Sequence, residues 1–306
     1  MNRYCFPKFA LIVLLFANLA CENEAPQRIL SLGHAYDWQQ GDRVDPRLEA
    51  LDFSKFDQIW LAGDVCSRTT ESPATLDYLD ALFQLRSERL HWAWGNHDVL
   101  FGNTENIIKH TGKPDFYVRW QNGFCLLVLN TNLFWYYADA PRQENCEAKA
   151  AQLALLKSVT DTIHDASHLV ILHHHALFNE LKKAAPDQPA DAFNGNAIPI
   201  RATCDSTSDL TKTAWPWLQQ VQQRGVQVVL VGGDLGMRAK TFEQQTPEGI
   251  WMLGSGINNS VVTSFAPDYV SSFAPDQVLV LNYWRSKRKL DWSFQSLQTL
   301  LSEAEN

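Results

Sequence analysis

Short apolar runs recur along the chain, and each is bounded by residues typical of turns. Runs of this length rich in Val, Ile, Leu and Trp predict β-strands, and their continuous apolarity predicts burial on both faces. They lie at 28–32, 56–62, 90–94, 124–130, 169–172, 226–231, 250–253 and 278–283. The C-terminal part, after about Gly249, has only strand and loop patterns, and we expect it to form a second sheet.

Helical periodicity separates several of these runs. Apolar residues line one face at 72–87, at 144–163 and at 213–224, where Gly225 provides a stop signal. Strands that alternate with helices predict an α/β fold. No linker-like stretch divides the chain, so we expect a single domain over about 27–300. An irregular Pro- and Asp-rich insertion at about 184–208 interrupts it, and long loops of this kind are commonly functional.

The N-terminus reads as a targeting signal. Arg3 and Lys8 precede a 12-residue apolar run, Phe9–Ala20, which is short for a membrane span. Residues 1–21 are therefore expected to be a secretory signal peptide. Ala20-Cys21 also resembles the end of a bacterial lipoprotein signal, in which Cys21 would carry lipid, although Asn18 departs from the usual Leu. Lipid-anchored and soluble forms both stay open, and both place the protein outside the cytoplasm, in the periplasm or at the bacterial envelope.

The cysteines and the net charge narrow the setting further. Cys66, Cys125, Cys146 and Cys204 remain after the signal, an even set that suggests up to two disulfides of undetermined pairing. The net charge is −8, and the longest basic stretch is Arg285-Ser-Lys-Arg-Lys289. The chain therefore shows no basic face for a nucleic-acid partner. The oligomeric state is not predicted.

Polar residues gather where the predicted strands end. Five strands are followed by His, Asp or Asn, often directly after glycine: His34; Asp64; Asn96, His97 and Asp98; His173, His174 and His175; and Asp234. Each case alone is typical of an ordinary turn or a structural histidine. Ligands of α/β sheets bind at the carboxyl ends of strands, so five such ends predict one convergent site.

The residue types at these strand ends indicate a metal site. Imidazole, carboxylate and amide groups suit one or two divalent transition metal ions, namely Zn, Mn or Fe. Two such ions can generate a hydroxide for attack at phosphorus, and a nearby His can protonate the leaving oxygen.

Gly63-Asp64, Gly95-Asn-His-Asp98 and His173-His-His175, in this order, resemble the calcineurin-like metallophosphoesterases over roughly 28–240. The resemblance implies a four-layer αββα sandwich with a two-metal centre. It implies Asp64 as the bridging carboxylate and Asn96 as a ligand of the second metal. It implies that His97 stabilises charge or protonates the leaving group, oriented by Asp98.

The histidine triplet, the opening motif and the closing motif each depart from the family pattern in this chain. The family ligand in the histidine triplet usually stands two residues before a Pro, a place taken by Ala176, which selects His174 with His173 and His175 as alternates. The opening Asp-x-His is Leu32-Gly-His34, and the closing Gly-His-x-His is Gly233-Asp-Leu-Gly236. Asp234 can replace the first His, but Gly236 offers no side chain.

Three states of the site therefore stay open. A two-metal site would use Asp37 or water to complete the first position. A one-metal site would keep Asp64, Asn96, His174 and Asp234. A degenerate site would bind no metal and serve as a binding or assembly factor in the cell envelope.

The expected substrate is a small phosphate mono- or diester. Trp135 and Tyr136 follow the fourth predicted strand, and together with the insertion they are candidates for shaping the pocket. Contact with a membrane is expected only through the possible lipid at Cys21. A sugar-binding protein that uses some of the eleven tryptophans is the alternative from a different class.

Overall fold

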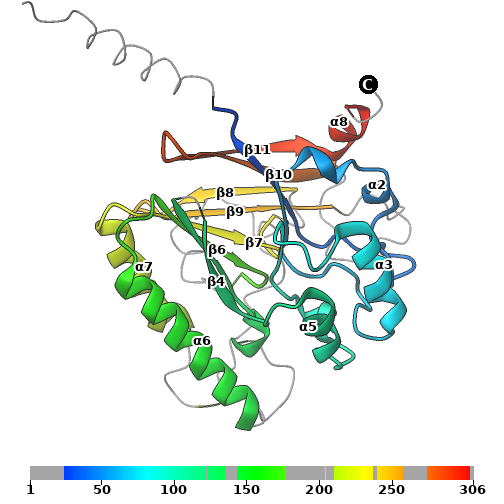
Figure 1. Cartoon of the computed structure of the whole chain (residues 1–306), viewed down its shortest axis with the longest axis horizontal. Helices are drawn as coiled ribbons and strands as arrows, with labels where there is room; N and C mark the ends of the chain where they lie inside the picture. The colour runs from blue at the N-terminus through cyan, green and yellow to red at the C-terminus, as the bar shows by residue number, and fades with distance from the viewer. Residues whose placement is uncertain are drawn as a thin grey trace, which may run out of the picture.

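Two mixed β-sheets pack face to face, with helices on the outer face of each (Figure 1). The structure is a computed structural model that describes residues 24–121, 123–134, 143–176, 204, 210–236, 240–257 and 274–303. Cys21, Trp135, Tyr136 and, apart from Cys204, the whole 184–208 insertion lie outside these residues. Among the described residues, no helix is both long and apolar enough to cross a membrane.

The first sheet has the strand order β11-β10-β1-β2-β3. The strands β1 (Gln27–Leu32), β2 (Gln58–Leu61) and β3 (Leu90–Trp92) run parallel. The hairpin of β10 (Gln277–Trp284) and β11 (Lys289–Ser296) is added antiparallel to β1, with Gln27 opposite Tyr283. The carboxyl ends of β1, β2 and β3 therefore share one edge.

The second sheet has the strand order β4-β5-β6-β7-β9-β8. Its parallel centre comprises β5 (Phe124–Val128), β6 (His168–His173), β7 (Gln227–Gly232) and β9 (Trp251–Ser255). Antiparallel strands β4 (Tyr117–Gln121) and β8 (Thr241–Gln245) form its two edges.

Three hydrophobic clusters separate the four layers. Ile29, Trp60, Val170 and Leu281 belong to the cluster between the sheets. The first sheet packs its other face on α2 (Pro46–Glu49), α3 (Pro73–Phe83), α5 (Glu105–Thr111) and α8 (Leu297–Ser302). The second sheet packs on α6 (Gln143–Thr162) and α7 (Leu210–Gln223). This is the expected αββα sandwich.

All eight apolar runs form strands, and the three helical patterns form α3, α6 and α7. The helix expected over 72–87 ends earlier, at Phe83, because Gln84 adopts a left-handed conformation (φ 55°) and its N–H caps the Asp80 carbonyl. Short elements without a clear periodic signal also form: the 3₁₀ helices Phe53–Lys55 and Thr131–Phe134, and α4 (Asn96–Val99).

The expectation of a separate sheet after Gly249 is wrong. Strand β9 joins β7 in the second sheet, whereas β10 and β11 extend the first sheet beyond β1. The reason is that β9 follows β7 as a further parallel strand, and β10 then crosses to cover the open side of β1. The C-terminal part thus completes both sheets.

One disulfide joins Cys146 in α6 to Cys204, with a Cα–Cα distance of 5.5 Å. The second of the two possible disulfides does not form. Cys66 and Cys125 are buried free thiols in different hydrophobic clusters, on the outer sides of opposite sheets, and cannot meet.

A buried histidine connects the two sheets where their edge strands β3 and β4 adjoin. His91 Nδ1 lies 3.0 Å from the Tyr117 hydroxyl, and Gln121 Nε2 lies 3.1 Å from His91 Nε2. Burial, with a smaller effect of Lys113, lowers the pKa of His91 from 6.5 to about 3. The neutral imidazole is therefore the form that this position accepts.

We expect this burial to make the fold sensitive to acid. The folded pKa lies below the unfolded value, so the stabilising effect is complete above pH 6.5 and is lost as the pH falls toward 3. At about 1.4 kcal/mol per pKa unit, His91 should account for about 3 kcal/mol of the unfolding free energy lost between pH 6.5 and 4. Urea denaturation in EDTA should show that His91→Gln flattens this pH dependence. The matched variant His164→Gln, whose side chain is 74% exposed, should not change it, and an unchanged slope in His91→Gln would contradict the assignment.

Candidate metal centre

Four side chains from four strand ends converge between the two sheets. His34 follows β1 and Asp64 follows β2 in the first sheet, while His174 follows β6 and Asp234 follows β7 in the second. His34 Nε2 lies 3.3 Å from Asp64 Oδ2 and 3.2 Å from Asp234 Oδ1. His174 Nε2 lies 3.4 and 3.6 Å from the same two oxygens. All four residues are buried.

Backbone conformation and glycine make this close approach possible. His34 (φ 50°) and Asp64 (φ 54°) both adopt the left-handed backbone region. This conformation costs free energy for residues other than glycine, and residues held in it are concentrated at functional sites. A Cβ on Gly95 would collide with the Asp64 carboxylate, and one on Gly233 would collide with the Ala62 carbonyl and the His174 ring. The glycines that precede the polar residues are therefore required by packing at the site.

The second nitrogen of each ligand histidine is held by a backbone carbonyl. His34 Nδ1 lies 3.1 Å from the Gly233 carbonyl oxygen, and His174 Nδ1 lies 2.9 Å from that of Ala62. Each bond joins one sheet to the other. With Nδ1–H donating to the carbonyl, Nε2 is the nitrogen that faces the carboxylates, and a metal ion that displaced its proton would bind there.

Opposite charges dominate the electrostatics of the cluster. Burial alone would lower the pKa of His174, but Asp64 and Asp234 outweigh it and raise the pKa to about 10. Burial alone would raise the pKa of Asp64, but His174 and His34 hold it well below its usual value. Both carboxylates face a positive group, which is the situation that a bound cation also provides.

These residues fit a single divalent ion. Each of the four ligand atoms lies 3.2–3.6 Å from two of the others. Neighbouring ligands of one ion with metal bonds of about 2.0–2.2 Å are separated by roughly 3–3.6 Å. His174 Nε2 is buried and has no hydrogen-bond partner. The ligand atoms of His34, His174 and Asp234 lie within 4.8 Å of one another and could hold one metal ion, and Asp64 lies beside both histidines of this group.

The neighbours of His174 in the triplet are turned to other partners. His173 Nδ1 is 2.9 Å from the His175 carbonyl oxygen, and His175 Nδ1 is 2.8 Å from the Thr131 hydroxyl. Burial lowers the pKa of His173 to about 4 and that of His175 well below its usual value. Of the three, the structure places His174 at the carboxylates.

Asp98 has a different role from the one expected. Its carboxylate does not hydrogen-bond the His97 ring. It accepts instead from the backbone N–H groups of Asp64, Val65 and Gly95 at 2.8–3.0 Å, from the Thr69 hydroxyl at 2.8 Å and from Trp92 Nε1 at 3.2 Å. The donors surround Asp98 because the loops after β2 and β3 both turn their N–H groups inward. Asp98 thus fixes the loop that carries Asp64.

Replacing Asp98 with asparagine should destabilise the fold. The amide would turn an NH₂ donor toward N–H and O–H donors and would leave some of them unsatisfied in a buried place. We expect a loss of about 3 kcal/mol in the free energy of unfolding. Chemical denaturation would measure it, with Asp52→Asn as the matched control. Asp52 accepts from Ser54 at the surface, a bond that asparagine also makes. Equal stability of the two variants would contradict the assigned role.

Asn96 and His97 open the short helix α4 beside the cluster. The His97 backbone N–H donates to Asp64 Oδ1 at 2.9 Å, the carboxylate oxygen that faces away from the two histidines. His97 Nδ1 is buried and has no hydrogen-bond partner. The buried Tyr36 ring is close to both His97 and His34. The distances between ring centroids are 5.6 Å to His97 and 6.0 Å to His34. Tyr36 is thus a site residue that the sequence pattern missed.

The altered motif positions cannot supply further ligands. Leu32 is fully buried in the cluster between the first sheet and its helices. Gly236 has φ 74°, and a Cβ there would come within 2.9 Å of the Gly254 carbonyl oxygen and the Phe242 nitrogen. Asp37 closes its own turn, where Oδ1 accepts from the N–H of Gln39 at 2.7 Å. Asp37 is therefore a buried turn residue rather than a replacement ligand.

A sixth polar strand end also belongs to the site. Asn130, Thr131 and Asn132 follow β5, and Asn132 Nδ2 donates to the carbonyls of Trp94 and Gly95 at 3.0 and 3.3 Å. Thr131 holds His175. These residues support the Gly95–Asp98 turn, and the strand-end criterion applied above would have found them.

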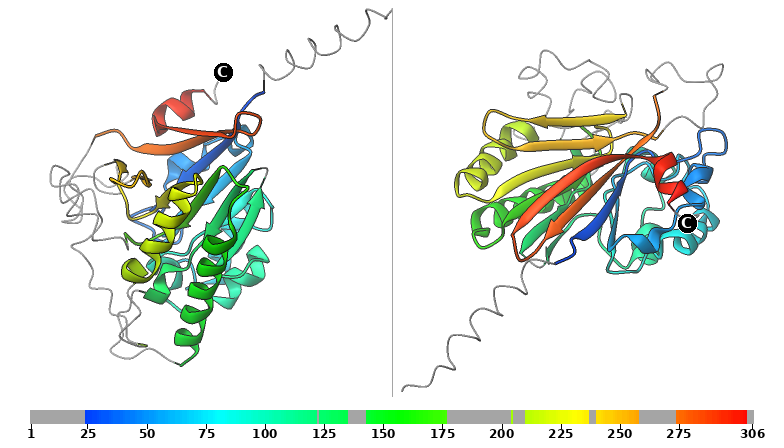
Figure 2. Two further views of the ribbon diagram at one scale, coloured as in Figure 1. Left: turned by 90° about the vertical axis from the view of Figure 1, so that its left-hand side faces the viewer. Right: turned by 90° about the horizontal axis from the view of Figure 1, so that it is seen from above.

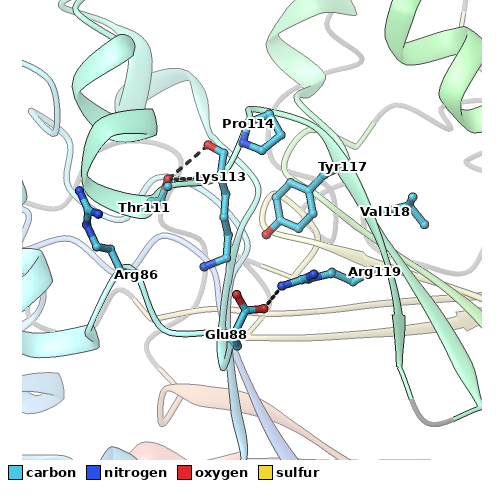
Figure 3. A pocket seen from close by; sticks show the side chains of 9 residues that line it. Arg86, Glu88, Thr111, Lys113, Pro114, Tyr117, Val118 and Arg119 are labelled. Atoms are coloured by element: carbon cyan, nitrogen blue, oxygen red, sulfur yellow. Dashed lines mark hydrogen bonds and ion pairs between the residues drawn. The ribbon is translucent and has the colours of Figure 1, made fainter.

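A cavity of about 430 Å³ lies away from the cluster, between the turn before β3, the end of α5 and strand β4 (Figure 3). Arg86, Glu88, Lys113, Tyr117 and Arg119 are among its lining residues, and Glu88 pairs with Arg119. None of the predicted site residues lines it. This cavity is therefore distinct from the candidate metal centre.

An αββα sandwich with a cluster of nitrogen and oxygen atoms at its strand ends defines an α/β protein with a candidate metal site. The model of the calcineurin-like phosphoesterase family matches residues 34–200, more than half of the chain, and the chain belongs to this family. Membership supports a phosphoesterase-type function that depends on divalent metal ions. A comparison with curated proteins found no match.

Among solved structures, the chain resembles the phosphopantetheinyl hydrolase from Mycobacterium tuberculosis. The two share 18% sequence identity, with a TM-score of 0.44, and the match covers 80% of this chain and 95% of the other. A likeness at this level carries no inference about substrate.

Proposed function

We propose that the protein is a one-metal phosphoesterase that hydrolyses a small phosphate mono- or diester outside the cytoplasm. The observation that carries the proposal is the single ligand set of His34, Asp64, His174 and Asp234, with each ligand atom 3.2–3.6 Å from two others. The mixture of imidazole and carboxylate suits Mn, Fe or Zn.

The residues around the cluster would have separate roles in metal binding, substrate binding and proton donation. A bound ion would polarise a phosphoryl oxygen and lower the pKa of water. His34 and His174 hold their ligand nitrogens in place through backbone carbonyls, and Asp64 is fixed by the His97 N–H. Asn96 begins α4 directly before His97, and its amide would complete the ligand set or bind the phosphate. The His97 side chain would donate a proton to the leaving oxygen.

The net charge of −8 argues against a nucleic-acid substrate and leaves a small phosphate ester as the favoured substrate. The signal-like N-terminus supports a location outside the cytoplasm. Lipid at Cys21, and pocket contacts from Trp135 and Tyr136, remain parts of this proposal that rest on the sequence.

The proposed activity is tested on aryl phosphate mono- and diesters with the purified protein. We expect turnover after loading with Mn²⁺, Fe²⁺ or Zn²⁺, loss of turnover in EDTA, and recovery when the same ion is returned. Absence of turnover with every ion, in a folded protein, would contradict the enzyme proposal.

A second candidate is a binding or assembly factor that retains the fold without catalysis. It is favoured by the loss of two first-metal ligands at Leu32 and Gly236, where packing leaves no room for replacement. This candidate predicts tight binding of a phosphorylated ligand with no turnover in the same assays.

A further inference from the structure

The turn between β10 and β11 concentrates positive charge at one end of the sandwich. Arg285, Lys287, Arg288 and Lys289 all lie within five residues and are exposed, in a chain whose net charge is −8. Trp284, immediately before them, is half-buried, and Lys289 Nζ lies 5.7 Å from the centroid of its ring. A basic turn with an adjacent tryptophan is a composition suited to an anionic lipid surface.

This turn lies where the N-terminal segment joins the fold. Glu24 Oε2 accepts from the Ser286 backbone N–H at 2.8 Å, and Gln27 pairs with Tyr283 at the start of β1. Figure 2 shows the turn beside the beginning of β1. Cys21 is three residues before Glu24, a span of at most about 10 Å of extended chain. Any membrane attachment through residues 9–21 would therefore hold the basic turn close to the lipid surface.

Acidic neighbours reduce the charge of the turn only in part. Lys289 pairs with Asp291, the Glu24 carboxylate lies against Ser286 and interacts with Arg285, and Arg288 donates to the Asp165 backbone carbonyl at 2.6 Å. Trp120, which is 56% exposed, lies near the same end and lines a cavity of about 410 Å³ together with Gln27. The end of the sandwich from which β1 starts thus presents cations and an exposed aromatic ring.

Strand polarity places the metal cluster at the opposite end. His34 follows the carboxyl end of β1, and six residues at about 3.3 Å each put about 20 Å between the two ends of that strand. Asp64 follows β2, which is parallel to β1. A protein that contacts the membrane through the β10–β11 turn would hold its reaction centre away from the lipid.

We propose that residues 284–289 bind anionic lipid headgroups beside the N-terminal attachment point, and that this orientation directs the metal centre to soluble phosphate esters. The first part rests on the expected membrane attachment. The second part rests on the proposed function, and it selects water-soluble esters over phospholipids in the same membrane.

Hydrogen exchange of the full-length protein on vesicles tests the contact. In vesicles of phosphatidylcholine with 30 mol% phosphatidylglycerol, as against phosphatidylcholine alone, we expect exchange of the amides at 284–290 to slow on the order of tenfold. The effect should disappear in 1 M salt, where charge interactions are screened. The loop 66–71, after β2 at the metal end, should show no change. Equal exchange at 284–290 in both lipids, or slowing at 66–71, would overturn the orientation.

A charge-matched pair of variants controls for net charge. R285S/K287S/R288S/K289S should lose the slowing at 284–290 and keep turnover of an aryl phosphate. R43S/R68S/K109S/K157S removes the same number of charges elsewhere and should keep the slowing. Loss of the effect in both variants would show a general charge effect and would overturn the assignment to the turn.

The substrate class is tested with phosphatidic acid in two forms, one soluble in water and one embedded in a membrane. We expect the full-length protein on vesicles to hydrolyse soluble dibutyroyl phosphatidic acid at least about a hundredfold faster than long-chain phosphatidic acid embedded in the same vesicles. Similar rates would overturn the selection of soluble esters. If neither lipid nor an aryl phosphate is hydrolysed, the proposed function fails, whereas the exchange result still decides the membrane contact.

Discussion

Replacing Asp64 with alanine is expected to abolish metal binding and to lower the rate of phosphate ester hydrolysis on the order of 10³-fold or more. Asp64 Oδ2 faces both ligand histidines, at 3.3 and 3.4 Å. Without it, two imidazoles share the single carboxylate of Asp234. Metal content by mass spectrometry and steady-state kinetics on an aryl phosphate would measure both effects.

The control variant changes Asp37, the aspartate that the sequence offered as a replacement ligand. Asp37→Asn keeps an oxygen that can accept from Gln39 and so preserves the turn. We expect this variant to hold metal and turn over at the parent rate. Loss of metal in Asp37→Asn, or retention of metal and activity in Asp64→Ala, would contradict the ligand set.

Replacing His97 with glutamine is expected to lower the rate of alkyl phosphate ester hydrolysis by a factor of about 10²–10⁴ while the metal stays bound. The link from His97 to the cluster runs through its backbone N–H to Asp64 Oδ1, which survives the substitution. The side chain has a buried Nδ1 without a hydrogen-bond partner, and its ring packs on Tyr36. The substitution therefore removes the imidazole without removing a ligand.

The dependence on the leaving group separates proton donation from a structural role. A nitrophenolate departs without protonation, so His97→Gln should slow a nitrophenyl ester much less than an alkyl ester. Equal slowing of both esters would refute the role of His97 as proton donor. Tyr36→Phe, which keeps the aromatic ring beside His97, should leave this pattern unchanged.

The sequence predicted the inner strands because they are apolar along their whole length. Strands β5 and β6 are buried at every position, so continuous apolarity alone identifies them. The three missed strands, β4, β8 and β11, all lie at sheet edges, where one face is partly exposed and polar residues interrupt the run. Which sheet each late strand joins depends on pairing between distant segments, which local patterns do not record.

Sequence reasoning brought the right strand ends together but could not resolve their geometry. His34, Asp64, His174 and Asp234 meet because parallel strands share an edge and two such edges adjoin. That His34 and His174 face the same two oxygens follows from hydrogen bonds across the sheets, to Gly233 and Ala62. Asp98 differed from its expected role because three of its five partners are backbone groups, which leave no signature in the residue pattern.

The number of metal ions held by the purified protein tests the account most directly. After loading with excess Mn²⁺ or Zn²⁺ and removal of free ion, elemental analysis should find one ion per chain, with a clear loss of affinity in His34→Ala as well as in His174→Ala. Two ions per chain, no bound ion, or full affinity in His34→Ala would contradict a single centre built from His34, Asp64, His174 and Asp234.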